Sequence, residues 1–229
     1  MLNIISLGIL VALVSLYSLI IYSSLTLVLI NALVTLMAAL FIYVRSTLYR
    51  ERIKLFMDMA SFIELMLLNI NVQKTIDGAF NAVKALLSET LTKKLSTLNI
   101  ADSRTVINEL TNYFAHHYYD IFTGLLFTYE ERGGDIIKMS EVLLLRLDST
   151  RGLINALQKI DLRYLIKFMS NWLFIFAIGV VFRYALSNVF TTLNNSIIFI
   201  IGNEVLIVIM LLSLIFVLEN KRRRMFNVH

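Results

Sequence analysis

The chain has 229 residues, of which 58% are hydrophobic, and its formal net charge is +5 at pH 7. Soluble domains of this length are about 45–50% apolar, so the composition excludes an ordinary soluble protein. Cysteine and proline are absent, which excludes disulfides and cysteine-based sites and favours long helices with few sharp turns.

The first 44 residues carry no charged side chain, because the first charged residue of the sequence is Arg45. As one helix they would measure about 66 Å, roughly twice an ~30 Å hydrocarbon core. We therefore predict two membrane spans in residues 1–44, joined by a tight turn near Ser23 and Ser24. The run lacks a basic start and is much longer than the apolar core of a secretory signal, so we expect it to be retained.

Residues 45–167 form a charged block with 16 basic and 14 acidic residues, long enough for a core of its own. Amphipathic periodicity predicts a six-helix bundle in this block. The first helix has a polar stripe of Lys54, Asp58, Ser61 and Glu64 and is expected to break at 69–71, with Asn71 as the next N-cap. Further helices are expected at about 72–87, 88–98, 104–116 (capped by Asp102 or Ser103) and 119–131.

Gly133 and Gly134 are expected to end the fifth helix, and Asp135 to open a sixth helix with no evident stop before the next apolar run. Gly152 weakens that helix by about 1 kcal/mol relative to alanine. Two interpretations stay open, a largely continuous rod from the domain into the membrane and a simple connector bent at Gly152.

Apolar runs at about 168–190 and 197–218 predict a second membrane hairpin in residues 168–219, with its loop at 191–196 and a basic tail at 220–229. Arg183 lies seven residues before Phe190, and Glu204 lies seven residues after Ile197. Because an antiparallel hairpin would place both charges at similar depth, we predict an ion pair between them. The functional alternative is a path for protons or a substrate.

Basic residues cluster after the second and fourth predicted spans, which the positive-inside rule places in the cytoplasm. We therefore expect a multi-pass membrane protein with the central domain and the C-terminus cytoplasmic. The same side chains are candidates for binding lipid headgroups or the protein partner rather than nucleic acid. They are Arg45, Arg50, Arg52, Lys54, Lys221, Arg222, Arg223 and Arg224.

The sequence contains no nucleotide-binding loop, no GxSxG and no HExxH, so we expect no catalytic residue and no cofactor. His116, His117 and Asp120 form the one histidine cluster, and His116 and Asp120 share a helix face. Metal sites need three or four ligands, and no third ligand is evident in the local sequence. We therefore expect no metal and interpret this cluster as a solvated helix end.

The most informative polar segment runs from Glu130 through Glu131 and Arg132 to Gly133 and Gly134. It places three charges at an exposed helix end that is expected to face the cytoplasm. One interpretation is a helix end capped by glycine. The other is a docking surface for a cytoplasmic partner.

Two segments carry a resemblance to a known family. Residues 62–68 form an apolar helix followed by the turn 69–76, with Ala79 in the matching place of the next helix, and residues 130–147 give an acidic residue, a glycine pair and a leucine-bearing helix. The chain thereby resembles the F domain family of type II secretion and type IV pilus systems, and most of all its TadC-like platform subunits. Asn69 stands where a glycine is expected, and the proline often found near 163–165 is missing.

The resemblance implies a small all-α cytoplasmic domain between membrane segments, in a non-enzymatic scaffold of a prokaryotic inner membrane. Its expected partners are a secretion-type hexameric ATPase, pilin subunits, membrane lipids and further copies or subunits in an oligomer. The motif carries over only to Glu131, Gly133 and Gly134. A small membrane transporter or channel subunit is the alternative, and a membrane-anchored signalling bundle is a third possibility.

Overall fold

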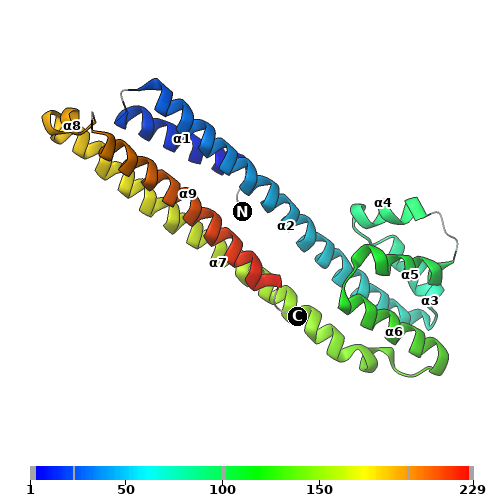
Figure 1. Cartoon of the computed structure of the whole chain (residues 1–229). Helices are drawn as coiled ribbons and strands as arrows, with labels where there is room; N and C mark the ends of the chain where they lie inside the picture. Colours follow the sequence, from blue (N-terminus) through cyan, green and yellow to red (C-terminus); the bar gives the residue numbers. More distant parts are fainter. Residues whose placement is uncertain (1–3, 23, 99–101, 195, 227–229) are drawn as a thin grey trace. The chain divides into compact units, whose positions relative to one another are not determined.

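In the computed structural model, residues 4–22, 24–98, 102–194 and 196–226 are described, and they contain helices and no strand. The expected all-α fold is confirmed. Nine helices lie in these ranges: α1 Ile4–Ile21, α2 Leu25–Gln73, α3 Ile76–Lys84, α4 Glu89–Leu98, α5 Ser103–Phe114, α6 His117–Arg132, α7 Ile136–Ala185, α8 Ser187–Asn194 and α9 Ile197–Phe226 (Figure 1).

The chain divides into two compact units, each with its own hydrophobic core. The central unit comprises Arg50–Ile154, and the apolar unit comprises Met1–Tyr49 together with Asn155–His229. The long helices α2 and α7 contribute to both units. A continuous segment is therefore inserted between two parts of the sequence that fold as one body.

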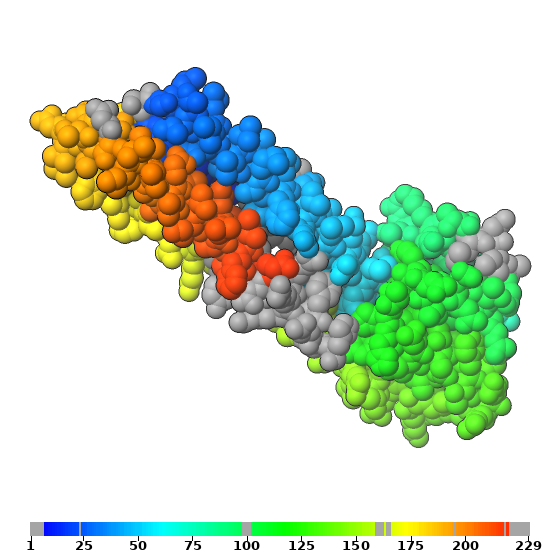
Figure 2. Space-filling model, in the orientation of Figure 1, coloured from blue at the N-terminus to red at the C-terminus, as the bar shows by residue number. Residues whose placement is uncertain are grey.

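The central unit contains α3 to α6, the C-terminal part of α2 and the N-terminal part of α7. Its helices pack into one compact body in the space-filling view (Figure 2). Phe62 on α2 is fully buried and contacts the rings of Phe114, Tyr119 and Phe122. The Tyr119 hydroxyl donates a 3.0 Å hydrogen bond to the carbonyl of Ile107, and burial raises the pKa of Tyr119. An aromatic core thus joins α2, α5 and α6.

The break expected at 69–71 is wrong, because α2 continues to Gln73. Asn69 keeps its place in the helix by donating a 2.8 Å hydrogen bond from its side chain to the carbonyl of Leu65. The chain leaves the helix at Lys74, whose φ is 60°, and Thr75 then caps α3 by accepting a 3.2 Å bond from the Gly78 amide. The turn is therefore formed by the left-handed Lys74 and the Thr75 cap, outside the asparagine segment 69–71.

The other predicted boundaries in the central unit lie close to those observed. Asp102 caps α5 and Gly133 ends α6, as expected. Asp135 accepts hydrogen bonds from the amides of Ile137 and Lys138, so it opens α7. The expectation that this helix has no stop before the third apolar run is confirmed, since α7 extends from Ile136 to Ala185.

The apolar unit contains α1, α8, α9, the N-terminal part of α2 and the C-terminal part of α7. Figure 1 shows α1 beside the start of α2 and α7 beside α9. Three helical segments in the described part of the chain are long and apolar enough to cross a membrane, namely Leu25–Gln73, Ile166–Ala185 and Ile197–Val217. A shorter apolar segment covers Leu7–Ile21 of α1.

The third apolar run is shorter than the predicted range of 168–190. Helix α7 ends at Ala185, and the separate short helix α8 begins at Ser187. Phe190 on α8 is buried and packs edge-to-face on Phe199 of α9, with ring centroids 5.3 Å apart. The hairpin connection is therefore a helix of its own rather than the loop expected at 191–196.

Candidate functional sites

The turn between α6 and α7 holds the residues predicted to dock a partner. Gly133 adopts φ 70° and ψ −160°, and Gly134 adopts φ 115°. Residues other than glycine rarely adopt these backbone conformations. The Gly133 amide donates a 2.8 Å bond to the carbonyl of Tyr129 and closes the helix. The two glycines are explained by this sharp reversal of the chain.

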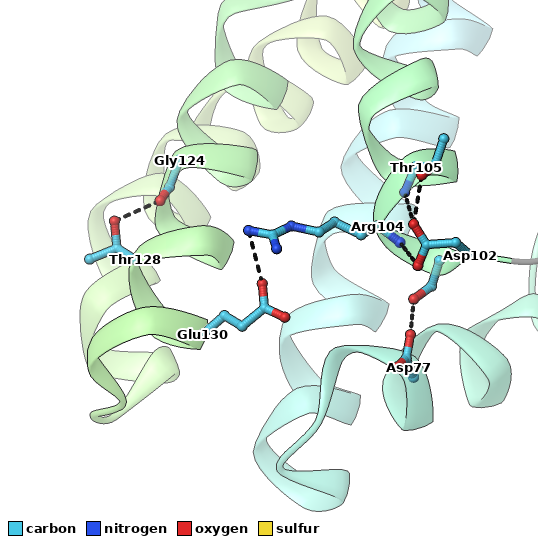
Figure 3. Close-up of polar contacts among 8 residues, drawn as sticks. Asp77, Asp102, Arg104, Thr105, Gly124, Thr128 and Glu130 are labelled. Carbon is cyan, nitrogen blue, oxygen red and sulfur yellow. Dashed lines mark hydrogen bonds and ion pairs between the residues drawn. The ribbon is translucent and has the colours of Figure 1, made fainter.

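The three charged residues of this turn are exposed but differ in their contacts. Glu130 lies 3.4 Å from the guanidinium of Arg104, which reaches across from α5 (Figure 3). Arg104 also lies over the ring of Phe127, 4.7 Å from its centroid. The side chains of Glu131 and Arg132 make no hydrogen bond or ion pair with other described residues. These two side chains are thus available to a partner, whereas Glu130 helps to hold α6 against α5.

The N-terminus of α5 is fixed by a group of polar contacts next to this ion pair (Figure 3). The Asp102 carboxylate accepts a 2.6 Å hydrogen bond from the Thr105 hydroxyl and bonds of 3.0 and 3.4 Å from the amides of Thr105 and Arg104. These donors lower the pKa of Asp102. Ser103 donates to Asp77 and thereby joins α5 to α3. The sequence indicated the Asp102 cap but gave no sign of the Asp77 contact.

His116 has a structural role at the start of α6. Its Nδ1 accepts a 3.2 Å hydrogen bond from the Tyr118 amide, so the imidazole serves as the N-cap. Its ring lies 5.4 Å from that of Phe56. His117 and Asp120 are both exposed. The residues that the structure describes hold no group of three side chains suited to a metal ion.

A buried polar network crosses the apolar unit and was not predicted from the sequence. The Asn31 side-chain amide on α2 donates to Ser18 Oγ of α1 at 3.2 Å and to Glu204 Oε1 of α9 at 3.0 Å. Ser18 and Asn31 are almost fully buried. The Tyr22 hydroxyl is buried and lies near the Glu204 carboxylate, but it makes no well-aligned hydrogen bond. One asparagine therefore ties together three apolar helices.

A second polar contact links α1 to the C-terminal hairpin. The Tyr17 hydroxyl donates a 2.9 Å hydrogen bond to the side-chain oxygen of Asn203. The Tyr17 ring stacks on Phe176 of α7 with centroids 4.3 Å apart. It also covers Gly179, where an added Cβ would lie only 3.0 Å from Tyr17 Cε2. The glycine thus permits the close approach of α1 to α7.

The structure does not bring Arg183 and Glu204 into the predicted ion pair. Both side chains are described, but Glu204 accepts its hydrogen bond from Asn31, and Arg183 lies over the Phe190 ring, 5.6 Å from its centroid. Arg183 is two residues from the end of α7, whereas Glu204 is seven residues into α9. The equal spacing on which the pairing was predicted is therefore absent, with an offset of five residues or about 7.5 Å of helix. The error came from placing the end of the span at Phe190.

The basic residues predicted to face lipid headgroups lie on the long helices. Arg45 on α2 is exposed and its guanidinium lies over Phe41, 5.4 Å from the ring centroid. Arg50, Arg52 and Lys54 continue along the same helix. The backbone of Lys221, Arg222, Arg223 and Arg224 belongs to α9, but their side chains lie outside the described part of the structure.

Compared with known proteins, the chain matches no family model, no curated protein and no solved structure. The resemblance drawn from residues 62–79 and 130–147 therefore stays an expectation. Two features of the described structure bear on function. They are the exposed turn at Glu131 and Arg132 in the central unit and the polar network around Asn31 in the apolar unit.

Proposed function

We propose that the protein is a non-enzymatic platform of a type IV pilus or type II secretion-like (Tad-like) machine in the inner membrane. It couples a cytoplasmic hexameric ATPase to the insertion or extraction of pilins. The observation that carries this proposal is the insertion of a self-contained all-α unit, Arg50–Ile154, between apolar segments that fold together as a second unit. The proposed partners, the ATPase and the pilins, are inferred from the resemblance to TadC-like platforms.

In this proposal the apolar unit spans the membrane four times as two helical hairpins. Helix α1 has 18 residues, which gives about 27 Å, close to the ~30 Å of a hydrocarbon core. Its contacts through Ser18 and Tyr17 to α2, α7 and α9 support its inclusion as the fourth span. The basic residues after α2's apolar part and at the end of α9 favour a cytoplasmic central unit.

The exposed turn after α6 is the proposed docking surface for the ATPase. Its glycines fix a sharp reversal, and Glu131 and Arg132 project from it without partners among the described side chains. A rigid turn with exposed charges of both signs suits electrostatic recognition, which sets specificity and orientation more than affinity.

The test is co-purification of the full-length protein with its hexameric ATPase from detergent extracts. Glu131→Lys should reduce the recovered ATPase several-fold, while Glu109→Lys should not, because Glu109 is an exposed acidic residue on α5 outside the turn. Equal recovery with both variants would remove the turn as the docking surface. Absence of any ATPase from the wild-type extract would count against the platform itself.

A small transporter or channel subunit is the second candidate. The network of Asn31, Ser18 and Glu204 favours it, because polar and ionisable groups inside a membrane often mark ion or substrate paths. Purified protein in liposomes should then carry ions or protons across the bilayer, and Asn31→Leu should stop the flux. If liposomes that contain the wild-type protein show no ion or proton flux, the network has only a structural role.

A further inference from the structure

Arg183 has no anionic partner among the side chains that the structure describes. It and Glu204 are the two charged residues between Phe168 and Leu218. The Nη1 atom of Arg183 is buried without a hydrogen-bond partner, and no described carboxylate forms an ion pair with the guanidinium. A charged nitrogen removed from water without a partner is costly. The other guanidinium nitrogens of Arg183 are not buried, so an anion from outside the chain can approach them.

The position of Arg183 along α7 indicates which anion is within reach. In the sequence the apolar run begins at Phe168, after Lys167, and α7 ends at Ala185, so this segment has 18 residues, about 27 Å of helix, close to the hydrocarbon core of a bilayer. Arg183 is two residues from the end of this segment, so it lies at the boundary between acyl chains and headgroups. The neighbouring Tyr184 is 71% exposed, as expected of tyrosines that mark the membrane–water interface. Phospholipid phosphates occupy this level.

The surroundings of Arg183 hold its guanidinium in a defined place. Phe190 on α8, whose ring lies 5.6 Å from Arg183 Cζ, is itself buried and packs against Phe199 of α9. A ring fixed in this way attracts the cation to its face and restricts the arginine to few positions. The planar fork of an arginine is suited to two oxygens of one phosphate, and pre-positioning lowers the entropic cost of binding.

We propose that Arg183 binds the phosphate group of a membrane phospholipid at the face where α7 ends, and that Phe190 positions its guanidinium. The site rests on the proposed membrane layout but not on the coupling to an ATPase. Its role is to hold a lipid at the junction between α7 and α8. A carboxylate from a membrane helix of another protein is the competing partner.

The experiment titrates purified full-length protein in a maltoside detergent with phosphatidylglycerol and counts bound lipids by native mass spectrometry. Wild type should retain lipid, and Arg183→Gln should bind it roughly tenfold more weakly, since one charge-assisted contact is lost. Arg183→Lys keeps the charge without the fork and should fall between them. Phe190→Leu should weaken binding without removing it.

Lys93→Gln is the matched control, because it removes one positive charge from an exposed ion pair on α4 of the central unit. It should leave lipid binding unchanged. The proposal is overturned if Arg183→Gln and Arg183→Lys both bind lipid like wild type. It is also overturned if a photo-crosslinker at position 184 captures another membrane protein in place of lipid in native membranes. The lipid titration needs no ATPase, so its failure leaves the proposed docking untouched.

Discussion

Arg151 on α7 donates hydrogen bonds to Glu64 and Ser61 on α2, with 3.1 Å between Nη2 and Ser61 Oγ. The Arg151 and Glu64 side chains are only 21% and 32% exposed, and they join the first and last helical segments of the central unit. Two residues of the expected polar stripe, Ser61 and Glu64, therefore do not only face solvent, because they accept hydrogen bonds from an arginine on the last helical segment of the unit.

This ion pair should be worth more than the exposed pairs of the protein. We expect a double-mutant cycle of Arg151→Ala and Glu64→Ala to give a coupling energy of about 1–2 kcal/mol, since a charge-assisted hydrogen bond joins these two partly buried side chains. The same cycle on Lys93 and Glu89, which are 76% and 84% exposed, should give less than about 0.5 kcal/mol. Chemical unfolding of the full-length protein in detergent measures both, and equal coupling energies would contradict the difference.

The Asn31 network should stabilise the apolar unit. Asn31→Leu leaves Ser18 and Glu204 without their shared donor, and hydrogen bonds between membrane helices contribute about 0.6 kcal/mol on average and up to about 1.7. We expect a loss in that range for the variant. Glu204→Gln keeps an oxygen for the Asn31 amide and should lose less. A reversible unfolding titration in mixed micelles gives the values, and greater damage from Glu204→Gln than from Asn31→Leu would contradict this account.

Gly179 should not tolerate a side chain. The Cβ of an alanine there would lie 3.0 Å from Tyr17 Cε2 and 3.1 Å from Tyr17 Oη, so the ring must shift by a few tenths of an ångström relative to Phe176 and Asn203. We expect Gly179→Ala to destabilise the protein by about 1–3 kcal/mol, as overpacking usually does. Gly8→Ala is the control, because nothing lies within 4 Å of an added Cβ, and it should cause no loss. Thermal unfolding in detergent compares the two.

The turn after α6 should require glycine for backbone reasons alone. Gly133→Ala forces an alanine into a conformation with φ 70° and ψ −160°, at a cost of about 1–3 kcal/mol. Gly124→Ala, inside α6 with free space around its Cβ, should instead be neutral or stabilise by up to about 1 kcal/mol. The melting temperature should therefore fall for Gly133→Ala and stay the same or rise for Gly124→Ala. A tolerated Gly133→Ala would show that the turn adapts to a side chain.

Asp102 should make the central unit sensitive to acid. Its hydrogen bonds from Thr105 and Arg104 lower its pKa in the folded state below the ordinary value of about 3.9. The stabilisation is therefore fully present above that value and is lost as the pH falls towards the folded-state pKa. Asp102→Asn retains a cap but cannot titrate. Between pH 6 and pH 3 its melting temperature should fall less than that of wild type, and parallel curves would rule out this contribution.

Local features were predictable from the sequence, and contacts between distant segments were not. Asp102 and Gly133 were identified because a cap depends on neighbouring residues. The break at 69–71 was misplaced because Asn69 satisfies its side chain within the helix, which composition does not reveal. The pairing of Arg183 with Glu204 failed because it depended on where α7 ends, and a few residues of error there shift the depth by a full helical turn.

The link from Asn31 to Glu204 has a consequence for how the chain is made. Ser18 and Asn31 are only 13 positions apart, so their hydrogen bond can form before α9 is synthesised. Glu204 follows Asn31 by 173 positions. In the proposed membrane layout, one hydrogen of the Asn31 amide therefore has to wait for α9 to find its acceptor, and a nascent chain truncated before residue 204 should bind other membrane helices more readily.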